Sequence, residues 1–332
     1  MRQAEFFRDS EKTTDCFLCP NYCRISEGQR GQCLGRGRVN GTMRLFNYGV
    51  VVAAHSDPIE KKPLYHFHPG ANIFSVGTYG CNLHCRFCQN CELSQEIQSG
   101  EEMSPDRMAA LAASHRGNIG VAFTYNEPGI WYEYIMDAAP LIRSRGHKVV
   151  LVTNGYLEPE PWERLCLVSD AMNIDLKGFS DDFYRDICFG KLAPVLANIA
   201  KAVEKGVHVE ITHLVVTDRN DRPELFEKLV DWLANLDQRI PLHLSRYFPR
   251  FHEVALPTDP AVLEEFRRLA ARKLRHVYLG NIDSEEGNDT RCPNCGKIWI
   301  HRDGYEVSVR HDGPKCVCGL EKNIPFGKAL YV

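Results

Sequence analysis

Four cysteines lie within eleven residues of the sequence, in the stretch YGCNLHCRFCQNCELSQ. Cys81, Cys85 and Cys88 have the spacing CxxxCxxC, and Cys91 follows three residues later. A short loop can place three thiolates around one [4Fe-4S] cluster, whereas a ferredoxin-type carrier ligates all four irons. Three ligands would leave one iron open to a substrate or cofactor. We therefore predict that Cys81, Cys85 and Cys88 hold a catalytic cluster, and Cys91 receives no role.

The alternative for this stretch is a zinc ion held by all four thiols. Structural zinc usually takes its ligands from two separated pairs of residues rather than from one run. If all three cysteine groups of the chain held zinc, the protein would be a non-catalytic scaffold that presents a docking surface. Metal analysis distinguishes this hypothesis from an iron-sulfur enzyme.

The elements around this stretch must position the cysteines. From residue 72 onward, short apolar or β-branched runs alternate with amphipathic helical stretches, which is typical of parallel strands joined by helical crossovers. The predicted strands cover residues 72–78, 118–124, 147–153, 171–176, 207–216, 240–245 and 276–281. Ser104 before Pro105 and Asp259 before Pro260 indicate helix starts, and Gly206 indicates a helix end. The pattern predicts an α/β fold, a partial or complete (β/α) barrel with its chemistry at the C-terminal ends of the strands, with an open doubly wound sheet as the alternative.

Polar motifs follow the predicted strands in order. The second strand ends in TYNEP, the third in TNG and the fourth in DLK. Each motif alone is commonplace, but one at each successive strand end after the cysteine loop is a specific arrangement. Because alternate residues of a strand face the same side, Asp175 and Lys177 are expected to point together. The candidate cofactor-binding residues are Asn126, Glu127, Thr153, Asn154, Asp175 and Lys177.

The cysteine loop closely resembles that of the radical SAM superfamily, and Phe87 matches the aromatic residue of its CxxxCxφC pattern. The resemblance implies that S-adenosylmethionine chelates the open iron. An electron from the reduced cluster would then cleave the cofactor to methionine and a 5′-deoxyadenosyl radical that abstracts hydrogen, while the protein orients both cofactors. It also implies that Asn126 and Glu127 lie near the methionyl amino group. Asp175 and Lys177 resemble the DxK pair that glycyl-radical activating enzymes place beside the methionyl group.

Three longer stretches, CFLCPNYCRISEGQRGQCLGR, DPIEKKPLYHFHPG and SVGTYGCNLHCRFCQN, closely resemble the AmmeMemoRadiSam system radical SAM proteins, which are related to pyruvate formate-lyase activating enzymes. The resemblance covers nearly the whole chain. It implies a radical SAM partial (β/α)6 TIM-like barrel, an electron donor such as flavodoxin or ferredoxin, and Memo-like and AMMECR-like partners. The expected substrate is a protein or peptide from which hydrogen is abstracted, as in a glycyl-radical activating enzyme, and radical chemistry on a small molecule is the alternative.

The sequence departs from those relatives at two positions. Val152 stands where pyruvate formate-lyase activating enzymes carry an aspartate before TNG, and Phe248 stands where some relatives have a histidine. His213 and Arg246 remain as further candidate cofactor contacts on the fifth and sixth strands. A histidine on a strand is, however, often a structural group rather than a ligand.

Two other cysteine groups flank the predicted barrel. The first has the spacing CxxCxxxCx9C, which suits a structural zinc, the preferred interpretation, or an auxiliary iron-sulfur cluster. The second resembles a rubredoxin-like or zinc-ribbon knuckle pair, but its second half is CxC rather than CxxC, which makes tetrahedral closure harder. We predict a cysteine-rich N-terminal region at 1–65, the barrel at 66–285 and a small metal-knuckle appendage at 286–332. The candidate ligands are Cys16, Cys19, Cys23 and Cys33 in the first group and Cys292, Cys295, Cys316 and Cys318 in the second.

Composition restricts the remaining possibilities. The chain of 332 residues has a formal charge of −3 and no basic block of the kind that binds a phosphate backbone, so nucleic acid is not an expected partner. No uncharged apolar run approaches the roughly 20 residues that span a bilayer, so no membrane association is expected. We expect a cytoplasmic protein in which the 14 cysteines are reduced, with Cys166 and Cys188 as small buried apolar residues.

Overall fold

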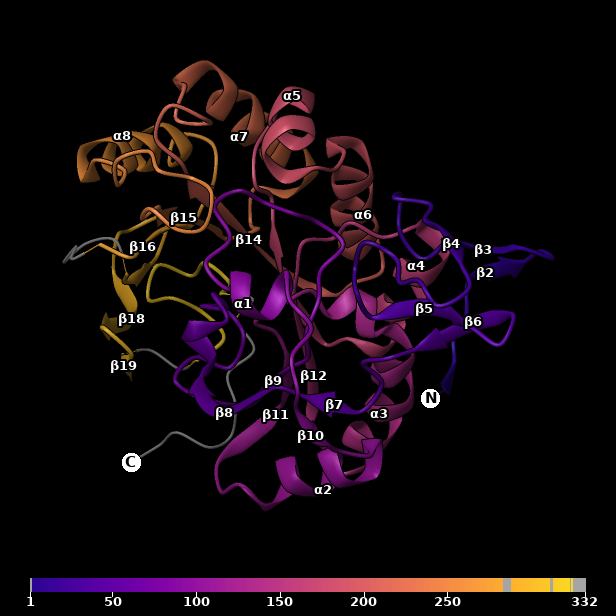
Figure 1. The fold of residues 1–332 in the computed structure, drawn as a ribbon. Coiled ribbons are helices and arrows are strands. Elements are labelled where there is room, and N and C mark those ends of the chain that lie inside the picture. Colours follow the sequence, from indigo (N-terminus) through magenta and orange to yellow (C-terminus); the bar gives the residue numbers. More distant parts are fainter. Residues whose placement is uncertain (1, 283–287, 311–312, 323, 325–332) are drawn as a thin grey trace.

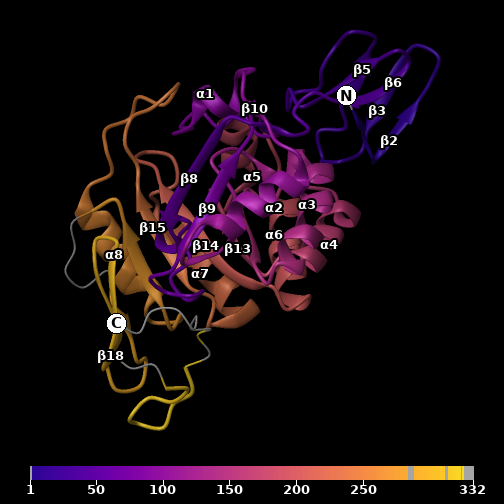
Figure 2. The same ribbon diagram turned by 90° about the horizontal axis from the view of Figure 1, so that it is seen from below.

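The computed structural model of the protein describes residues 2–282, 288–310, 313–322 and 324. A central sheet surrounded by helices forms the main body of the molecule (Figure 1). The N-terminal region and the C-terminal segment lie on opposite sides of this body in both views (Figures 1 and 2). No helix within the described parts of the chain is long and apolar enough to cross a membrane.

The central sheet has eight strands in the order β16-β15-β14-β13-β12-β11-β9-β8. All neighbouring pairs from β9 to β16 are parallel, and β8 pairs with β9 in the antiparallel direction. The strand order follows the chain without a reversal, whereas a doubly wound sheet reverses at a switch point. The two edge strands do not pair, so the sheet is a partial barrel as predicted. The strands are β8 (Ala53–Pro58), β9 (Asn72–Gly77), β11 (Asn118–Phe123), β12 (Lys148–Thr153), β13 (Ala171–Asp175), β14 (His208–Val215), β15 (Leu242–Arg246) and β16 (Val277–Gly280).

Helices connect the parallel strands and lie around the outside of the sheet (Figure 2). Their starts follow the expected capping signals: the Ser104 hydroxyl accepts the backbone N–H of Arg107, and the Asp259 carboxylate accepts that of Ala261. The helices are α1 (Cys91–Ser94), α2 (Pro105–Ser114), α3 (Tyr132–Ser144), α4 (Pro159–Val168), α5 (Asp181–Phe183), α6 (Leu192–Glu204), α7 (Pro223–Asp237) and α8 (Pro260–Ala270). Three further helical turns are η1 (Ile59–Lys61), η2 (Pro128–Trp131) and the π-helical η3 (Tyr184–Cys188).

The connection between β8 and β9 closes one end of the barrel interior. Ile59, Leu64 and Phe67 of this connection pack with apolar side chains from the inner face of the sheet, including Ile73 and Ala171 near strand starts. The connection is also held by polar contacts, because its backbone N–H groups at residues 65 and 66 donate to a buried carboxylate of β14 at 2.9 and 2.7 Å. The interior is thus filled at the N-terminal ends of the strands, and the C-terminal ends remain available for a ligand.

The N-terminal region forms small antiparallel sheets beside the barrel. A buried ion pair at 2.5 Å between Arg36 and Glu133 attaches this region to α3. The predicted region 1–65 also contains β8, which the structure adds to the central sheet, so the sheet begins before residue 66. The strands are β1 (Arg2–Gln3), β5 (Arg36–Val39) and β6 (Thr42–Leu45) in one sheet, β2 (Phe7–Asp9), β3 (Thr13–Cys16) and β4 (Arg24–Ser26) in a second, and β7 (Val50–Val51) with β10 (Glu101–Glu102) in a third.

The C-terminal segment forms a three-stranded antiparallel sheet of β17 (Thr290–Arg291), β18 (Ile298–Asp303) and β19 (Glu306–Val309). Arg302 attaches this sheet to the barrel: its guanidinium donates to the backbone carbonyl of Tyr65 at 2.7 Å and lies over the Tyr65 ring. The predicted boundary between residues 285 and 286 falls outside the described residues, as do several positions of the predicted appendage.

Candidate functional site

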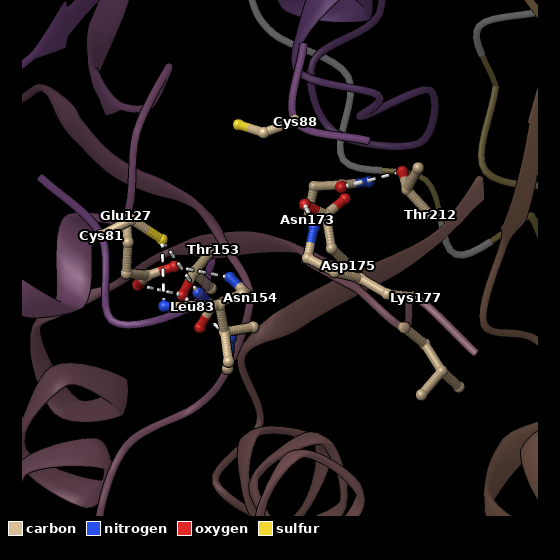
Figure 3. Close-up of polar contacts among 12 residues, drawn as sticks. Cys81, Leu83, Cys88, Glu127, Thr153, Asn154, Asn173, Asp175, Lys177 and Thr212 are labelled. Carbon is tan, nitrogen blue, oxygen red and sulfur yellow. Dashed lines mark hydrogen bonds and ion pairs between the residues drawn. The ribbon is translucent and has the colours of Figure 1, made fainter. Parts of the chain in front are cut away.

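A cavity of about 350 Å³ lies at the C-terminal ends of the parallel strands. Its walls come from the cysteine loop after β9, from the ends of β11 to β16, and from Lys61 and Lys62 of the connection between β8 and β9. Figure 3 shows Cys81, Glu127 and Asn154 in one group and Asp175, Lys177 and Thr212 in another, with Cys88 reaching in from a separate segment. The predicted residues that line the cavity are Cys81, Cys85, Phe87, Cys88, Asn126, Glu127, Thr153, Asn154, Asp175 and Lys177.

Backbone hydrogen bonds fix the cysteine loop. Gly80 has a φ of +94°, a left-handed conformation that favours glycine, and its N–H donates to the carbonyl of Leu93 at 2.8 Å. The N–H groups of His84 and Arg86 donate to carbonyls of η3, at 3.1 and 3.0 Å. The loop is therefore held at both sides by neighbouring segments, which presents its thiols in a defined arrangement.

The thiols of the cysteine loop are largely buried, and N–H groups donate to the sulfur of Cys81. The sulfur of Cys81 accepts from the N–H of Leu83 at 3.4 Å and from the amide of Asn154 at 3.7 Å. Burial raises the pKa of Cys81 well above its ordinary value, whereas a hydrogen bond with Cys188 lowers the pKa of Cys85. The N–H donors favour the thiolate of Cys81 against this burial, and a bound metal ion would favour it further.

The sulfur separations argue against one zinc ion in the loop. Tetrahedral zinc with Zn–S bonds of about 2.3 Å places its sulfurs about 3.8 Å apart. In the part of the chain that the structure describes, the C-terminal cysteines form the one group of at least three metal-ligating side chains whose ligand atoms all lie within 4.8 Å. The loop sulfurs are more widely spaced, as a multinuclear cluster requires. Cys91 is half-buried at the start of α1 and does not line the cavity.

Asn126 braces the start of the loop. Its side-chain carbonyl accepts the backbone N–H of Thr78 at 3.2 Å, and its amide donates to the carbonyl of Gly80 at 2.8 Å. Both polar atoms of the side chain are thus engaged with the chain just before Cys81. Asn126 positions the loop, in addition to lining the cavity.

Glu127 connects two strand ends. One carboxylate oxygen accepts from the N–H of Gly129 at 2.7 Å and from the hydroxyl of Thr153 at 2.6 Å, and the other accepts from the N–H of Asn154 at 2.7 Å. Burial raises the pKa of Glu127 to about 7 in spite of these donors. Hydrogen bonds of Glu127 therefore join the TYNEP and TNG motifs beside the cysteine loop.

Asp175 and Lys177 form an ion pair at 3.0 Å on the opposite wall. Burial opposes the charge of Lys177, but Asp175 and the thiols of Cys85 and Cys188 raise its pKa well above the ordinary value. The ammonium group also lies 6.0 Å from the centre of the Phe87 ring. A fixed cation beside a carboxylate is complementary to the carboxylate and amino groups of an amino acid.

Two predicted cofactor contacts do not reach the cavity. His213 is buried on the helix-covered face of β14, where it bonds to the carbonyl of Leu176 at 2.8 Å and packs on Phe226. Arg246 donates to the carbonyl of Thr258 at 2.7 Å and lies over the Phe248 ring. In both strands the neighbouring residue faces the cavity, so alternation turns these two side chains away.

The structure also brings in residues that the sequence analysis did not select. Thr212 is opposite Asp175 in the sheet, and its hydroxyl donates to the side chain of Asn173 at 2.9 Å. The alternation of β14 was the available signal, because it turns Thr212 to the face opposite that of Val209, Ile211 and Val215. The further polar lining residues are Lys61, Lys62, Gln89, Asn90, Ser94, Gln95, Thr124, Tyr125, Ser245 and Asn281.

The C-terminal cysteines can hold a metal ion. The sulfurs of Cys292 and Cys318 are 3.6 Å apart, as are those of Cys295 and Cys316. The backbone N–H of Cys318 is the main cause that lowers the pKa of Cys316 to about 6, which favours a thiolate. The CxC spacing was expected to hinder tetrahedral closure, but glycines with positive φ after Cys295 and Cys318 turn the chain tightly enough to bring the four sulfurs together.

Comparisons with known proteins agree with this geometry. The model of the Radical SAM superfamily matches residues 75–233. An uncharacterized protein of Methanocaldococcus jannaschii is 39% identical over 336 residues, which cover 98% of this chain and 99% of that protein. A pyruvate formate-lyase-activating enzyme of Listeria monocytogenes is 23% identical over 174 residues, 49% of this chain and 70% of the enzyme. The crystal structure of a radical SAM methyltransferase from Sphaerobacter thermophilus has a similar fold, with a TM-score of 0.52 and 16% identity over 70% of this chain and 71% of that one.

Proposed function

The chain belongs to the radical SAM superfamily, and from this premise we propose that it is an activating-enzyme-like oxidoreductase that abstracts hydrogen from a protein or peptide. The observation that carries the proposal is the cavity itself. It joins three loop cysteines to an Asp-Lys pair from β13 and the segment after it, although these groups come from distant parts of the sequence. A three-cysteine ligand set leaves the fourth iron of a [4Fe-4S] cluster for a cofactor.

The residues of the cavity fit both cofactors. Cys81, Cys85 and Cys88 would ligate three irons. When bound, the cluster and S-adenosylmethionine together supply reductive cleavage of the cofactor and a 5′-deoxyadenosyl radical. Lys177 would bind the methionyl carboxylate and Asp175 the methionyl amino group, each through a charge-assisted hydrogen bond.

The surrounding residues orient these ligands. Asn126 holds the backbone before Cys81, and Glu127 ties the ends of β11 and β12 together. Phe87 excludes water beside Lys177, which strengthens the ionic contacts there. Because the radical is reactive, this exclusion also protects it from side reactions.

A protein or peptide substrate is favoured over a small molecule by the size and the rim of the cavity. A volume of about 350 Å³ is at the lower end of small-ligand sites, so it leaves little room for a small-molecule substrate beside the two cofactors. Residues 248–256, which we name the rim segment, border the cysteine loop: Gln89 donates to the carbonyl of Phe248, and the N–H of His252 donates to the carbonyl of Arg86. Large apolar side chains are exposed on this segment, with Val254 83% and Leu256 77% exposed. Exposed apolar side chains gathered on one segment are typical of a surface that contacts another chain.

The relatives support the same substrate class. One relative is named a pyruvate formate-lyase-activating enzyme, and the motifs shared with such enzymes include the cysteine loop and DLK. A glycine of a partner protein is therefore the first candidate for the hydrogen donor. The resemblance to the AmmeMemoRadiSam system makes Memo-like and AMMECR-like proteins the partners to test, in the cytoplasm, with a flavodoxin or ferredoxin as reductant.

The test is an anaerobic assay with the reconstituted protein, dithionite and S-adenosylmethionine. The proposal expects 5′-deoxyadenosine and methionine from the wild type and none from Cys85→Ala. Cys91→Ala is the matched control, because Cys91 belongs to the same run but does not line the cavity, and it should retain activity. Deuterated candidate proteins should then transfer deuterium into 5′-deoxyadenosine. Absence of 5′-deoxyadenosine from iron-loaded wild type would refute the enzymatic proposal, and transfer from a metabolite but not from any protein would favour the small-molecule alternative.

A further inference from the structure

The four N-terminal cysteines surround a second, much smaller cavity. Cys16 ends β3, and Cys19, Cys23 and Cys33 come from the turns that follow it. The cavity lies among these four thiols, with Ile130 of η2 and Arg36 of β5 in its wall. Its volume is about 10 Å³. Three of the four thiols are buried and the fourth, Cys23, is half-buried, so little of the site is exposed to solvent.

The separations of these sulfurs differ from those of the C-terminal group. The C-terminal sulfurs all lie within 4.8 Å of one another, as one tetrahedral ion requires. Within the described residues, no three of the N-terminal sulfurs meet that condition. Both cysteine groups belong to the same structure, so their sulfur separations can be compared directly. Four thiols that line one small cavity, with no three of them gathered within 4.8 Å, suit ligands bound to different atoms of a larger group.

A [4Fe-4S] cluster has this property, because each cysteine binds its own iron. In a [2Fe-2S] cluster or at a single zinc ion, at least two cysteines share one metal atom and must lie close together. Among the described contacts, the C-terminal sulfurs pair at 3.6 Å, and no such pair occurs between the N-terminal thiols. The spacing therefore favours the four-iron cluster.

Arg36 supplies a second, independent observation. Its side chain is 1% exposed, and one guanidinium nitrogen reaches the sulfur of Cys16 at 4.0 Å. The Nε atom of Arg36 is buried and has no hydrogen-bond acceptor among the described residues. A buried donor without an acceptor is costly, and the sulfide and thiolate sulfurs of a cluster would provide one. Arg36 is also ion-paired with Glu133 at 2.5 Å, so its charge would be shared between that carboxylate and the thiolates of a cluster.

This cavity adjoins the loop that carries Cys81. The carbonyl oxygen of Cys33 lies so close to Gly80 that a β-carbon on Gly80 would be 2.1 Å from it. The side chain of Asn21 donates to the carbonyl of Asn82 at 2.7 Å. Residues on both sides of Cys81 thus contact the N-terminal cysteine segment directly, which provides a short path for electrons.

We propose that Cys16, Cys19, Cys23 and Cys33 hold a second [4Fe-4S] cluster, and that this cluster passes electrons to the one held by Cys81, Cys85 and Cys88. The step is a transfer of one electron: a reduced donor protein converts the second cluster from the 2+ to the 1+ state, and the second cluster returns to 2+ as the loop cluster is reduced. No bond forms or breaks in this step. The proposal goes beyond the proposed function, because a radical SAM site needs only one cluster.

Metal content tests the site without depending on catalysis. The variant Cys81→Ala/Cys85→Ala/Cys88→Ala removes the loop cluster and leaves the N-terminal region intact. After anaerobic reconstitution it should retain about four irons and about four sulfides per chain, and the wild type should contain twice that amount. Adding Cys19→Ser should remove this iron, whereas adding Cys166→Ser, a buried cysteine of α4 outside every cysteine group, should not. A triple variant that contains zinc in place of iron, or no metal beyond the C-terminal ion, would overturn the site.

Rapid freeze-quench electron paramagnetic resonance tests the transfer in the wild type, where folding of a variant is not a concern. The triple variant supplies the reference spectrum of the reduced N-terminal cluster. With reduced flavodoxin as the donor, that spectrum should appear first and decline as the loop-cluster signal, which responds to added S-adenosylmethionine, rises. Reduction of the loop cluster while the N-terminal cluster stays oxidised would refute the relay. Loss of 5′-deoxyadenosine formation with both clusters present would instead count against the proposed function.

Discussion

Asn126 could either contact the cofactor or hold the cysteine loop in place. Replacement of Asn126 by alanine distinguishes these two roles. The resemblance places Asn126 near the methionyl amino group, whereas the structure commits both of its polar atoms to the backbone of residues 78 and 80. The substitution removes two hydrogen bonds, each worth about 1 kcal/mol, and leaves a donor and an acceptor without partners, so the loop should lose about 2 to 4 kcal/mol. Because the loop carries the three proposed cluster ligands, Asn126→Ala should release iron to a chelator at least about tenfold faster than the wild type.

The assay follows iron loss to a chelator under anaerobic conditions and then measures binding of S-adenosylmethionine to the fraction that keeps its cluster. The affinity of that fraction should remain within about threefold of the wild type, less than 1 kcal/mol. Gln89→Ala is the matched control, because Gln89 is an amide on the same loop but is exposed and bonds only to the carbonyls of Phe87 and Phe248. It should retain iron normally. Asn126→Ala could instead keep its iron as well as the wild type and bind S-adenosylmethionine more than tenfold more weakly. That result would show that Asn126 contacts the cofactor and does not hold the cysteine loop in place.

Three further predictions concern charge, pH and metal. Lys177→Met should weaken binding of S-adenosylmethionine about 10- to 100-fold by calorimetry, the loss of one charge-assisted hydrogen bond, with unchanged iron content; unchanged affinity would exclude a contact. Burial lowers the pKa of His213 to about 4, so this residue contributes fully to stability above its unfolded pKa of about 6.5 and loses that contribution as the pH falls toward 4. Between pH 7 and 5 the wild type should therefore lose about 2 kcal/mol more in urea unfolding than His213→Asn, and equal losses would contradict the burial argument. Cys295→Ser should abolish zinc binding and increase hydrogen exchange in residues 298–309 without loss of iron; zinc retained at the wild-type level would show that the four-sulfur site is not the zinc site.

Much of the barrel was predictable because its parallel strands are buried on both faces. Strands of this kind have short apolar sequences. The seven predicted strands correspond to β9 and β11 to β16. The motifs TYNEP, TNG and DLK could be assigned to one cavity because parallel strands end at the same side of a sheet. The antiparallel strand β8, with its half-exposed sequence AAHSDP, carries no such signal and was not predicted.

His213 and Arg246 occupy strand positions whose side chains point away from the cavity. In β14, Val209, Ile211 and Val215 alternate with the polar residues, and His213 has the parity of this apolar set. In β15 the same holds for Arg246, which shares the face of Leu242 and Leu244. Since a strand turns alternate side chains to opposite faces, the period of two could have excluded both residues from the cavity.

Other features could not be obtained from sequence patterns. The closeness of the C-terminal sulfurs depends on two glycine turns and on the pairing of β17, β18 and β19. The wide separation of the N-terminal sulfurs depends on how their turns pack on η2 and β5. Cysteine spacing is similar for zinc and for iron-sulfur clusters, so only three-dimensional distances separate them.

Spectroscopy of the reduced loop cluster with isotopically labelled S-adenosylmethionine most directly tests whether three protein ligands leave one iron for the cofactor. In protein carrying Cys19→Ser, so that only the loop cluster contributes, nitrogen-15 in the amino group and oxygen-17 in the carboxylate should each give a hyperfine coupling to the cluster. The couplings should persist in the same protein carrying Cys91→Ser. A cluster that shows neither coupling, and that is lost when Cys91 is replaced, would have four protein ligands and would contradict the account.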